Sequence, residues 1–159
     1  MHGNQLVVNE QPRGRWMEGI ISGTPVPGTC MQINAATEPV AGKFTWVAYN
    51  AGADGNRALV AVLGPKGSSL FGYGMLDVYV SGEVGQIYIP AIGDELNMLV
   101  ADVAGTADTR AIGDIMIITN GTGKLKGTTG TPQSQPFIVM ETTPAPTADI
   151  LVQCMYNGY

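Results

Sequence analysis

The side chains that could act as acids, bases or nucleophiles are few in this chain. The only histidine is His2, close to the N-terminal end, so a Ser-His-Asp or Cys-His site would lack a general base. Five carboxylates lie close together and raise the question of a paired-carboxylate hydrolase or a calcium loop: Asp94, Glu95, Asp102, Asp108 and Asp114. The D-x-D-x-D-G spacing of a calcium loop is absent, and aspartates that follow glycine are typical of turns. The sequence therefore predicts no catalytic residue and no enzyme.

Metal and cofactor motifs also fail on their spacing. Cys30 and Cys154 lie far apart, without a C-x-x-C pair or a histidine partner. We therefore expect two buried free thiols rather than a zinc site, and whether the two meet is left open. The stretch 120–127 (NGTGKLKG) is similar to a phosphate loop, but the Walker pattern needs glycine at Ile118 and Ser or Thr at Leu125. A hairpin turn explains the same residues, so we expect no metal and no cofactor.

Composition narrows the fold class and the partners. Charged residues make up 13% of the 159 residues, about half the usual share. Glycine occurs 22 times and proline 10 times, which favours many short strands joined by turns. A net charge of −5 without basic clusters argues against nucleic acid as a partner. The first twenty residues lack the apolar core of a signal peptide, and no apolar run is long enough to span a membrane. We expect a soluble protein made in the cytoplasm.

The elements that would position any site are strands. Turn residues separate short runs in which apolar and polar side chains alternate, as expected for half-buried strands. One segment, 95–104, fits a short amphipathic helix as well as a strand. The tetrapeptide AIGD precedes an apolar run twice, at 91–94 and 111–114, and such a turn favours a strand in both cases. Strands are predicted over 19–22, 29–34, 44–49, 58–63, 76–81, 86–89, 95–100, 114–119, 137–141 and 149–156.

The chain divides into an arm and a barrel. Residues 1–16 are predicted to form an extended N-terminal arm outside the core, with a disordered terminus as the alternative. Residues 17–159 are predicted to form a single small β-barrel domain with an insertion loop around 50–75. We expect the arm to bind a partner through one apolar run and an aromatic anchor at its base: Leu6, Val7, Val8 and Trp16. Three residues of the insertion loop are candidate contacts, unless they fold back onto the core: Leu70, Phe71 and Tyr73.

The order of turns and strands resembles a known family. The segments that carry the resemblance are 19–23 (GIISG), 27–31 (PGTCM), 80–83 (VSGE), 87–91 (IYIPA), 111–114 (AIGD) and 124–126 (KLK). Over about residues 17–156 the chain resembles the capsid decoration (cement) proteins of tailed bacteriophages. In these proteins a small β-barrel, also called a β-tulip, is built from such turns and strands.

The resemblance implies a binding protein without chemistry. Such a protein is expected to form a homotrimer on the outer surface of the virion, where it binds the major capsid protein and ties neighbouring capsomers together. An extended arm could add a strand to a sheet edge of the shell. Two alternatives remain: another virion structural module, such as a head-fibre base or a tail component, and a small carbohydrate-binding β-module. The latter would need an exposed aromatic platform, for which the candidates are Trp46, Tyr49, Phe71 and Tyr73.

Overall fold

The computed structural model describes residues 6–8, 12–50, 60–66, 75, 77–101, 110–127, 137–143 and 148–158. Within these ranges all regular structure is β, which confirms the predicted all-β class. Most of the predicted insertion loop around 50–75 lies outside the described residues. The strands are β1 (Arg15–Ile21), β2 (Cys30–Ile33), β3 (Thr45–Ala48), β4 (Ala61–Leu63), β5 (Val84–Ile89), β6 (Glu95–Val100), β7 (Ile115–Ile118), β8 (Leu125–Gly127), β9 (Phe137–Val139) and β10 (Ile150–Tyr156).

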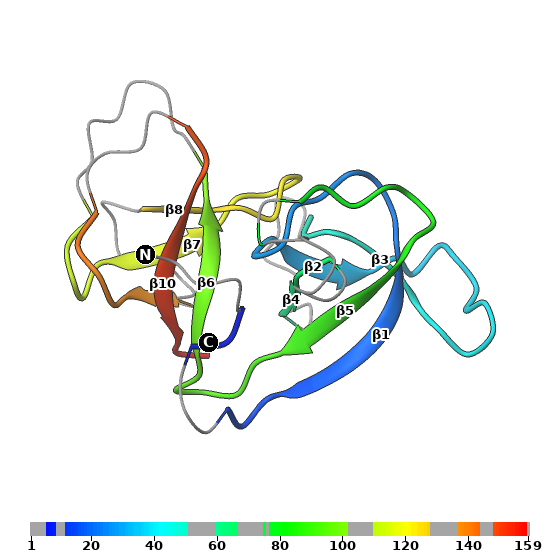
Figure 1. Cartoon of the computed structure of the whole chain (residues 1–159), viewed down its shortest axis with the longest axis horizontal. Helices are drawn as coiled ribbons and strands as arrows, with labels where there is room; N and C mark the ends of the chain where they lie inside the picture. Colours follow the sequence, from blue (N-terminus) through cyan, green and yellow to red (C-terminus); the bar gives the residue numbers. More distant parts are fainter. Residues whose placement is uncertain are drawn as a thin grey trace.

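The strands close into two five-stranded barrels, where the sequence predicted one barrel over 17–159. The first barrel has the order β1-β3-β2-β4-β5 and the second the order β10-β6-β8-β7-β9, and the two lie side by side (Figure 1). The first barrel closes early because β5 pairs along β1 from Arg15↔Ile89 to Ile20↔Val84. No edge of β5 is then free for a strand of the second half, so residues 95–156 build a barrel of their own.

The two barrels have the same topology and the same register. In each, the first strand pairs in parallel with the third, at Ile21↔Trp46 in one barrel and Val100↔Leu125 in the other. When the strands of each barrel are counted in chain order, the remaining pairs are antiparallel in both barrels: first with fifth, second with third, second with fourth, and fourth with fifth. Following the register around each barrel makes Met17 equivalent to Leu96, because Met17 lies opposite Ile87 and Leu96 lies opposite Cys154. Apart from Arg15 and Thr45, each residue of β1 to β5 therefore has a structural counterpart in β6 to β10.

Counterparts in the two barrels fill the same interior positions. The interior of the first barrel is a cluster of Ile21, Met31, Trp46, Ala61, Leu63, Tyr79 and Ile87. Their register counterparts in the second barrel, where one exists, are all buried as well: Val100, Met116, Leu125, Phe137, Val139 and Cys154. Along a strand, residues that point inward alternate with residues that point outward. Short strands with an apolar residue at every second position therefore suffice to build both interiors.

A shared core joins the barrels. The outward-facing Cys30, Val62 and Tyr88 of the first barrel belong to the same buried cluster as Leu99 and Leu151 of the second. Backbone hydrogen bonds cross the same junction: Leu99 donates to the carbonyl of Gly28 at 3.0 Å and Cys30 donates to that of Gly123 at 2.8 Å. The junction is thus packed and hydrogen-bonded like the interior of a barrel.

Four turns of one design launch strands β2, β5, β6 and β7. In each turn the third residue is a glycine with φ between 83° and 95°, and the amide of the fourth residue donates to the carbonyl of the first at 3.0 to 3.2 Å. This is the pattern of a type II turn, which favours glycine at its third position. The turns span residues 26–29, 80–83, 91–94 and 111–114. The two AIGD segments therefore precede strands as predicted, and 95–100 is a strand rather than a helix.

One predicted strand is wrong. The described part of 76–81, residues 77–81, has no strand. The amide of Tyr79 donates to the carbonyl of Pro25 at 3.0 Å, and the amide of Val80 donates to the carboxylate of Glu83 at 2.7 Å. These bonds to a loop and to a side chain take the place of a strand ladder.

Candidate functional site

The predicted arm is partly built into the core. Val7 forms an antiparallel bridge with Leu96. The amide of Val8 donates to the carbonyl of Glu95 at 2.8 Å, and the amide of Asn97 donates to the carbonyl of Leu6 at 2.8 Å. The Leu6 side chain is only 1% exposed and belongs to the shared core. The prediction of an arm outside the core is therefore wrong for Leu6. The physical reason is that β6 meets β8 only at Val100, which leaves most of its outer edge open to residues 6–8.

Truncating Leu6 to alanine is expected to lower the free energy of unfolding by about 1 to 2 kcal/mol. A buried Leu→Ala change costs about 2 to 5 kcal/mol in a rigid core, but a terminal segment can detach locally and so limit the loss. The matched control is Val8→Ala, because Val8 lies in the same segment and is 39% exposed. Urea unfolding of both variants checks the prediction. Equal stability of the two variants would mean that Leu6 is not packed.

Asp94 binds the chain before β1 to the start of the second barrel. One of its carboxylate oxygens accepts from the amide of Arg13 at 2.9 Å. The other accepts from the amide of Gly14 at 3.0 Å, the Tyr88 hydroxyl at 2.6 Å and the amide of Ala91 at 2.9 Å. Burial opposes the charge, but these hydrogen bonds outweigh it and hold the pKa of Asp94 below its usual value. Asp94 is thus a fully satisfied structural acceptor.

The other candidate carboxylates do not join Asp94 in a site. Asp114 is exposed and accepts from the amide of Ala111 at 2.8 Å. It lies at the opposite end of the second barrel, because β6 is parallel to β8 and β7 is antiparallel to it. Glu95 accepts from the side-chain amide of Gln153 at 2.7 Å. Asp102 and Asp108 lie outside the described residues.

Trp16 packs on its own barrel and remains half exposed. Its ring centroid lies 4.9 Å from that of Tyr88, opposite it in the β1–β5 pair, with a tilt of 50°. A Cβ atom on Gly64 would contact the Trp16 ring at 2.7 Å, so the indole also covers the end of β4. With 48% of its surface exposed, Trp16 packs on the barrel and still presents an aromatic face.

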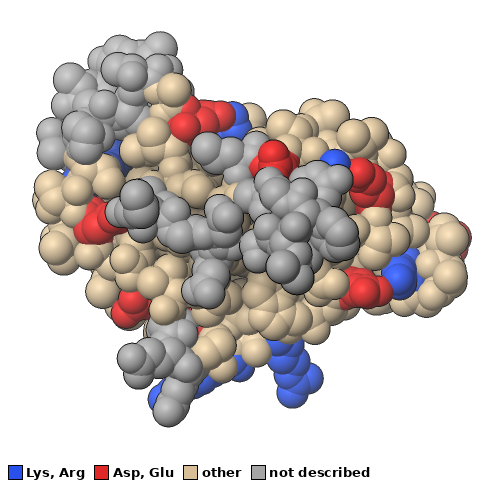
Figure 2. Space-filling view, in the orientation of Figure 1, with Lys and Arg blue, Asp and Glu red and all other residues tan. Residues whose placement is uncertain are grey.

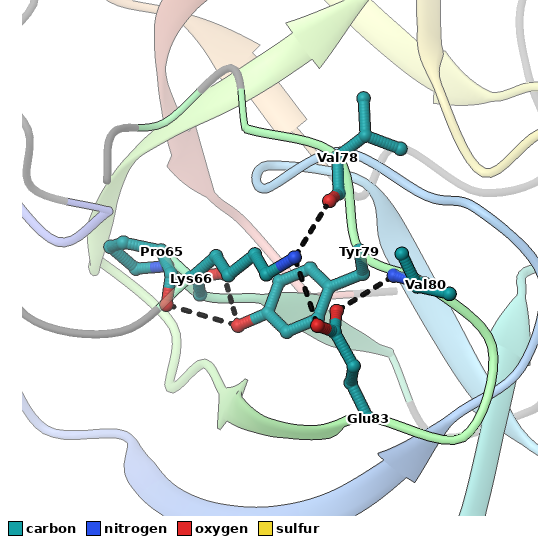
Figure 3. A network of polar contacts seen from close by, with 7 residues as sticks. Pro65, Lys66, Val78, Tyr79, Val80 and Glu83 are labelled. Atoms are coloured by element: carbon teal, nitrogen blue, oxygen red, sulfur yellow. Dashed lines mark hydrogen bonds and ion pairs between the residues drawn. The ribbon is translucent and has the colours of Figure 1, made fainter. Parts of the chain in front are cut away.

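A polar network near residues 64–83 was not found from the sequence (Figure 3). The Lys66 ammonium lies 2.9 Å from the Glu83 carboxylate and donates to the carbonyl of Val78 at 3.2 Å. The Tyr79 hydroxyl donates to the carbonyl of Pro65 at 3.0 Å. The amide of Val80, followed by Lys66, lowers the pKa of Glu83. The network holds the irregular segment before β5 against the end of β4.

Exposed aliphatic side chains occur in and next to this network and at two turns elsewhere in the chain. Val78, Val80 and Val84 are each about half exposed (49%, 58% and 53%), and we call them the valine group. Ile92 and Ile112 occupy the second position of the two AIGD turns and are each 67% exposed. Charged groups form small separate spots on the face in Figure 2, several of them with a basic group beside an acidic one, and most of its described surface is uncharged. Such a surface suits contact with another protein better than contact with a charged polymer.

The remaining candidates contribute no site in the described residues. Trp46 and Tyr49 are buried, so neither belongs to an exposed aromatic platform. Leu70, Phe71 and Tyr73 lie outside the described residues. Within the described ranges, no group of three or more His, Cys, Asp or Glu side chains is placed to hold a metal ion.

The cysteines are buried and free, as predicted. Burial raises the pKa of both thiols, that of Cys154 to about 12, so both are protonated at neutral pH. In the part of the chain that the structure describes, no helix could cross a membrane.

The comparisons with known proteins give a fold match without a sequence family. No family model and no curated protein matches the chain. Among solved structures, the chain is similar to the crystal structure of the head fiber gp8.5 N base in bacteriophage phi29. The TM-score is 0.51 at 11% sequence identity, and the match covers 91% of this chain and 94% of that one. At this identity the likeness shows a shared fold along nearly the whole length of both chains.

Proposed function

We propose that this chain is a non-enzymatic structural protein of a tailed-phage virion that binds the outer surface of the capsid. Its partner in this proposal is the major capsid protein. The observation that carries the proposal is the fold similarity to a phage head-fiber base over 91% of the chain. The order of turns and strands supports the same class of protein independently, because it resembles that of capsid decoration proteins.

The surface supports a role in an assembly. Charged residues make up only 13% of the chain, and the valine group together with Ile92 and Ile112 exposes aliphatic side chains. Burying aliphatic surface stabilises a protein contact by roughly 25 cal/mol per Å². Two hydrogen-bonded barrels with a shared core present these side chains from a preformed framework, which limits the entropy lost on binding.

Two roles on the capsid fit this proposal. As a cement protein, the chain would act as a homotrimer that ties neighbouring capsomers together, and three linked weak contacts would bind strongly by avidity. As the base of a head fibre, it would attach a further structure to the shell without stabilising the lattice. The fold similarity to a head-fiber base supports the second role. The resemblance in sequence order favours the first.

Co-sedimentation with empty expanded capsids of the phage that encodes the chain tests the proposal. We expect saturable binding, and native mass spectrometry of capsid-released protein should find a homotrimer. A cement protein should raise the temperature at which the capsids disrupt, whereas a head-fibre base should bind and leave it unchanged. Absence of binding at micromolar concentration would overturn the proposal, and a monomer in both free and released material would overturn the trimer.

A further inference from the structure

The edge that residues 6–8 occupy in the second barrel has a counterpart in the first. In the second barrel the outer edge of β6 is paired at three points. The amide of Asn97 donates to Leu6, the carbonyl of Glu95 accepts from Val8, and the amide of Leu99 donates to Gly28. By the shared register, the counterparts of Glu95, Asn97 and Leu99 on β1 are Trp16, Glu18 and Ile20.

Among the described residues, only one of these three counterparts has a backbone partner on the side away from β5. The amide of Ile20 donates to the carbonyl of Phe44 at 2.9 Å, matching the bond of Leu99 to Gly28. The β1–β3 pairing is limited to Ile20 and Ile21, just as β6 meets β8 only at its end. No backbone partner for the Glu18 amide or the Trp16 carbonyl exists among the residues that the structure describes.

The unpaired groups point away from the barrel. Glu18 lies opposite Gln86 in the β1–β5 pair. The backbone of Gln86 faces β4, because its carbonyl accepts a hydrogen bond from the amide of Gly64 at 2.8 Å. Glu18 and Gln86 are therefore a pair without backbone hydrogen bonds between them. In such a non-hydrogen-bonded antiparallel pair, the N–H and C=O groups of each residue point away from the partner strand. With respect to the described residues, the Glu18 amide and the Trp16 carbonyl therefore form an open stretch of strand edge, and open edges bind extended chains.

The side chains beside this edge suit an apolar strand. Trp16 is 48% and Phe44 is 40% exposed, and Met17 is half-buried. The one charged pair at the edge is already neutralised, because the Lys43 ammonium lies 2.6 Å from the Glu18 carboxylate. Hydrogen bonding with β1 would thus bring an added strand against aromatic and aliphatic surface.

We propose that the outer edge of β1 binds an extended aliphatic segment of another virion protein, antiparallel to β1, with its central residue opposite Met17. The second barrel supplies the template for this occupant, the run Leu6-Val7-Val8, whose central residue lies opposite Leu96. In each chain this run already occupies the edge of its own β6, so it is not free to pair with β1 of another copy. The identity of the partner, the major capsid protein, rests on the proposed function.

A synthetic peptide of residues 3–10 (GNQLVVNE) is the probe for the edge itself. Added to the whole chain, it should slow hydrogen exchange of the Glu18 amide at least tenfold and leave that of Gly19, which already faces β5, unchanged. The Asn97 amide reports separately on displacement of the chain's own run. N-methylation of the peptide at Val8 removes the bond to the Trp16 carbonyl and should abolish protection, whereas N-methylation at Val7, which faces away, should not. Equal behaviour of the two methylated peptides, or protection of Asn97 alone, would overturn the edge site.

Capsid binding then tests whether the major capsid protein is the partner that binds the edge of β1. Glu18→Pro removes the amide at a position where an edge strand tolerates proline, and Glu18→Ala is the control that keeps it. We expect Glu18→Pro to weaken capsid co-sedimentation at least fivefold relative to Glu18→Ala, with equal melting temperatures. Equal binding would overturn the capsid protein as occupant. Protection of Glu18 that rises with protein concentration alone would show a second copy there instead. If the unmodified chain fails to bind capsids while the peptide result holds, the proposed function falls and the edge site stands.

Discussion

Replacing Asp94 by asparagine is expected to lower the free energy of unfolding by about 3 kcal/mol. The carboxylate accepts four hydrogen bonds, from the amides of Arg13, Gly14 and Ala91 and from the Tyr88 hydroxyl. An asparagine side chain has one acceptor oxygen, and its NH2 group would face at least one of these donors. A buried donor left without a partner costs about 1 to 3 kcal/mol, and bonds to a charged acceptor are stronger than bonds to a neutral one.

The second AIGD turn provides the matched control. Asp114 occupies the same turn position, but it is exposed, and among the described residues its carboxylate accepts a hydrogen bond only from the Ala111 amide. Asp114→Asn is therefore expected to cost less than about 1 kcal/mol, as for other exposed hydrogen bonds. Urea unfolding of both variants, analysed with a common m-value, measures the difference. Losses of equal size in the two variants would show that the chain before β1 is not held by Asp94.

The same carboxylate should make stability depend on acid pH. Hydrogen bonds hold the pKa of Asp94 in the folded protein below its usual value, which in an unfolded chain is about 3.9. Its contribution is therefore fully present above about pH 4 and is lost as the pH falls through the folded pKa. The free energy of unfolding should fall more steeply below pH 4 in the unmodified chain than in Asp94→Asn. Glu18 and Glu83, whose pKa values are also lowered, should leave a smaller slope in the variant.

The local elements of this fold could be predicted because they depend on local rules. The AIGD segments form type II turns in which glycine takes the positive φ, and alternation of apolar side chains marks β6 and β10. The segment 76–81 failed because its partners, Pro25 and Glu83, come from a loop and a side chain. Apolar content alone does not distinguish a strand from a segment buried by such contacts.

The division into two barrels could not be predicted, because closure depends on pairs between distant strands. On β1, the parallel β1–β3 pairing covers only Ile20 and Ile21. A pairing this short produces no periodic pattern of apolar residues in the sequence. The barrels also fill their interiors differently, since Trp46 in one stands where Leu125 stands in the other. A duplicated architecture with such different side chains shows no repeat longer than a turn.

The positions of the candidate residues could be predicted only in part, because some of their contacts also come from distant strands. Trp16 was recognised as an aromatic anchor, and it packs on Tyr88 of its own barrel. Leu6 was assigned to a free arm because nothing near it in sequence could bury it, whereas residues of β6, about ninety positions away, do so. The edge of β1 that lacks a partner among the described residues is recognised only by comparing the two barrels. No residue type in the sequence predicts it.

Adding a single methyl group at Gly123 is expected to damage the junction between the barrels more than any change in the turn beside it. A Cβ atom there would collide with the carbonyl oxygen of Cys30 and lie 2.8 Å from the Thr29 side chain and 3.1 Å from the Tyr49 amide. The Cys30 carbonyl is a backbone atom that already accepts from Tyr49, so the barrels themselves would have to move apart. Gly123 also has a φ of +66°, which costs a residue with a side chain about 1 kcal/mol or more.

Gly121→Ala separates backbone strain from the collision. Gly121 lies in the same turn with a φ of +81°, and a Cβ atom there would meet nothing within 4 Å. We expect a loss of about 1 kcal/mol for Gly121→Ala from the backbone alone and of about 3 kcal/mol or more for Gly123→Ala, since forced overpacking adds about 1 to 3 kcal/mol. Melting temperatures and urea unfolding of the two variants measure this difference. If the losses are equal, the contact between Gly123 and Cys30 does not hold the barrels together. If Gly123→Ala unfolds in two separate transitions, the barrels are independently stable once this contact is broken.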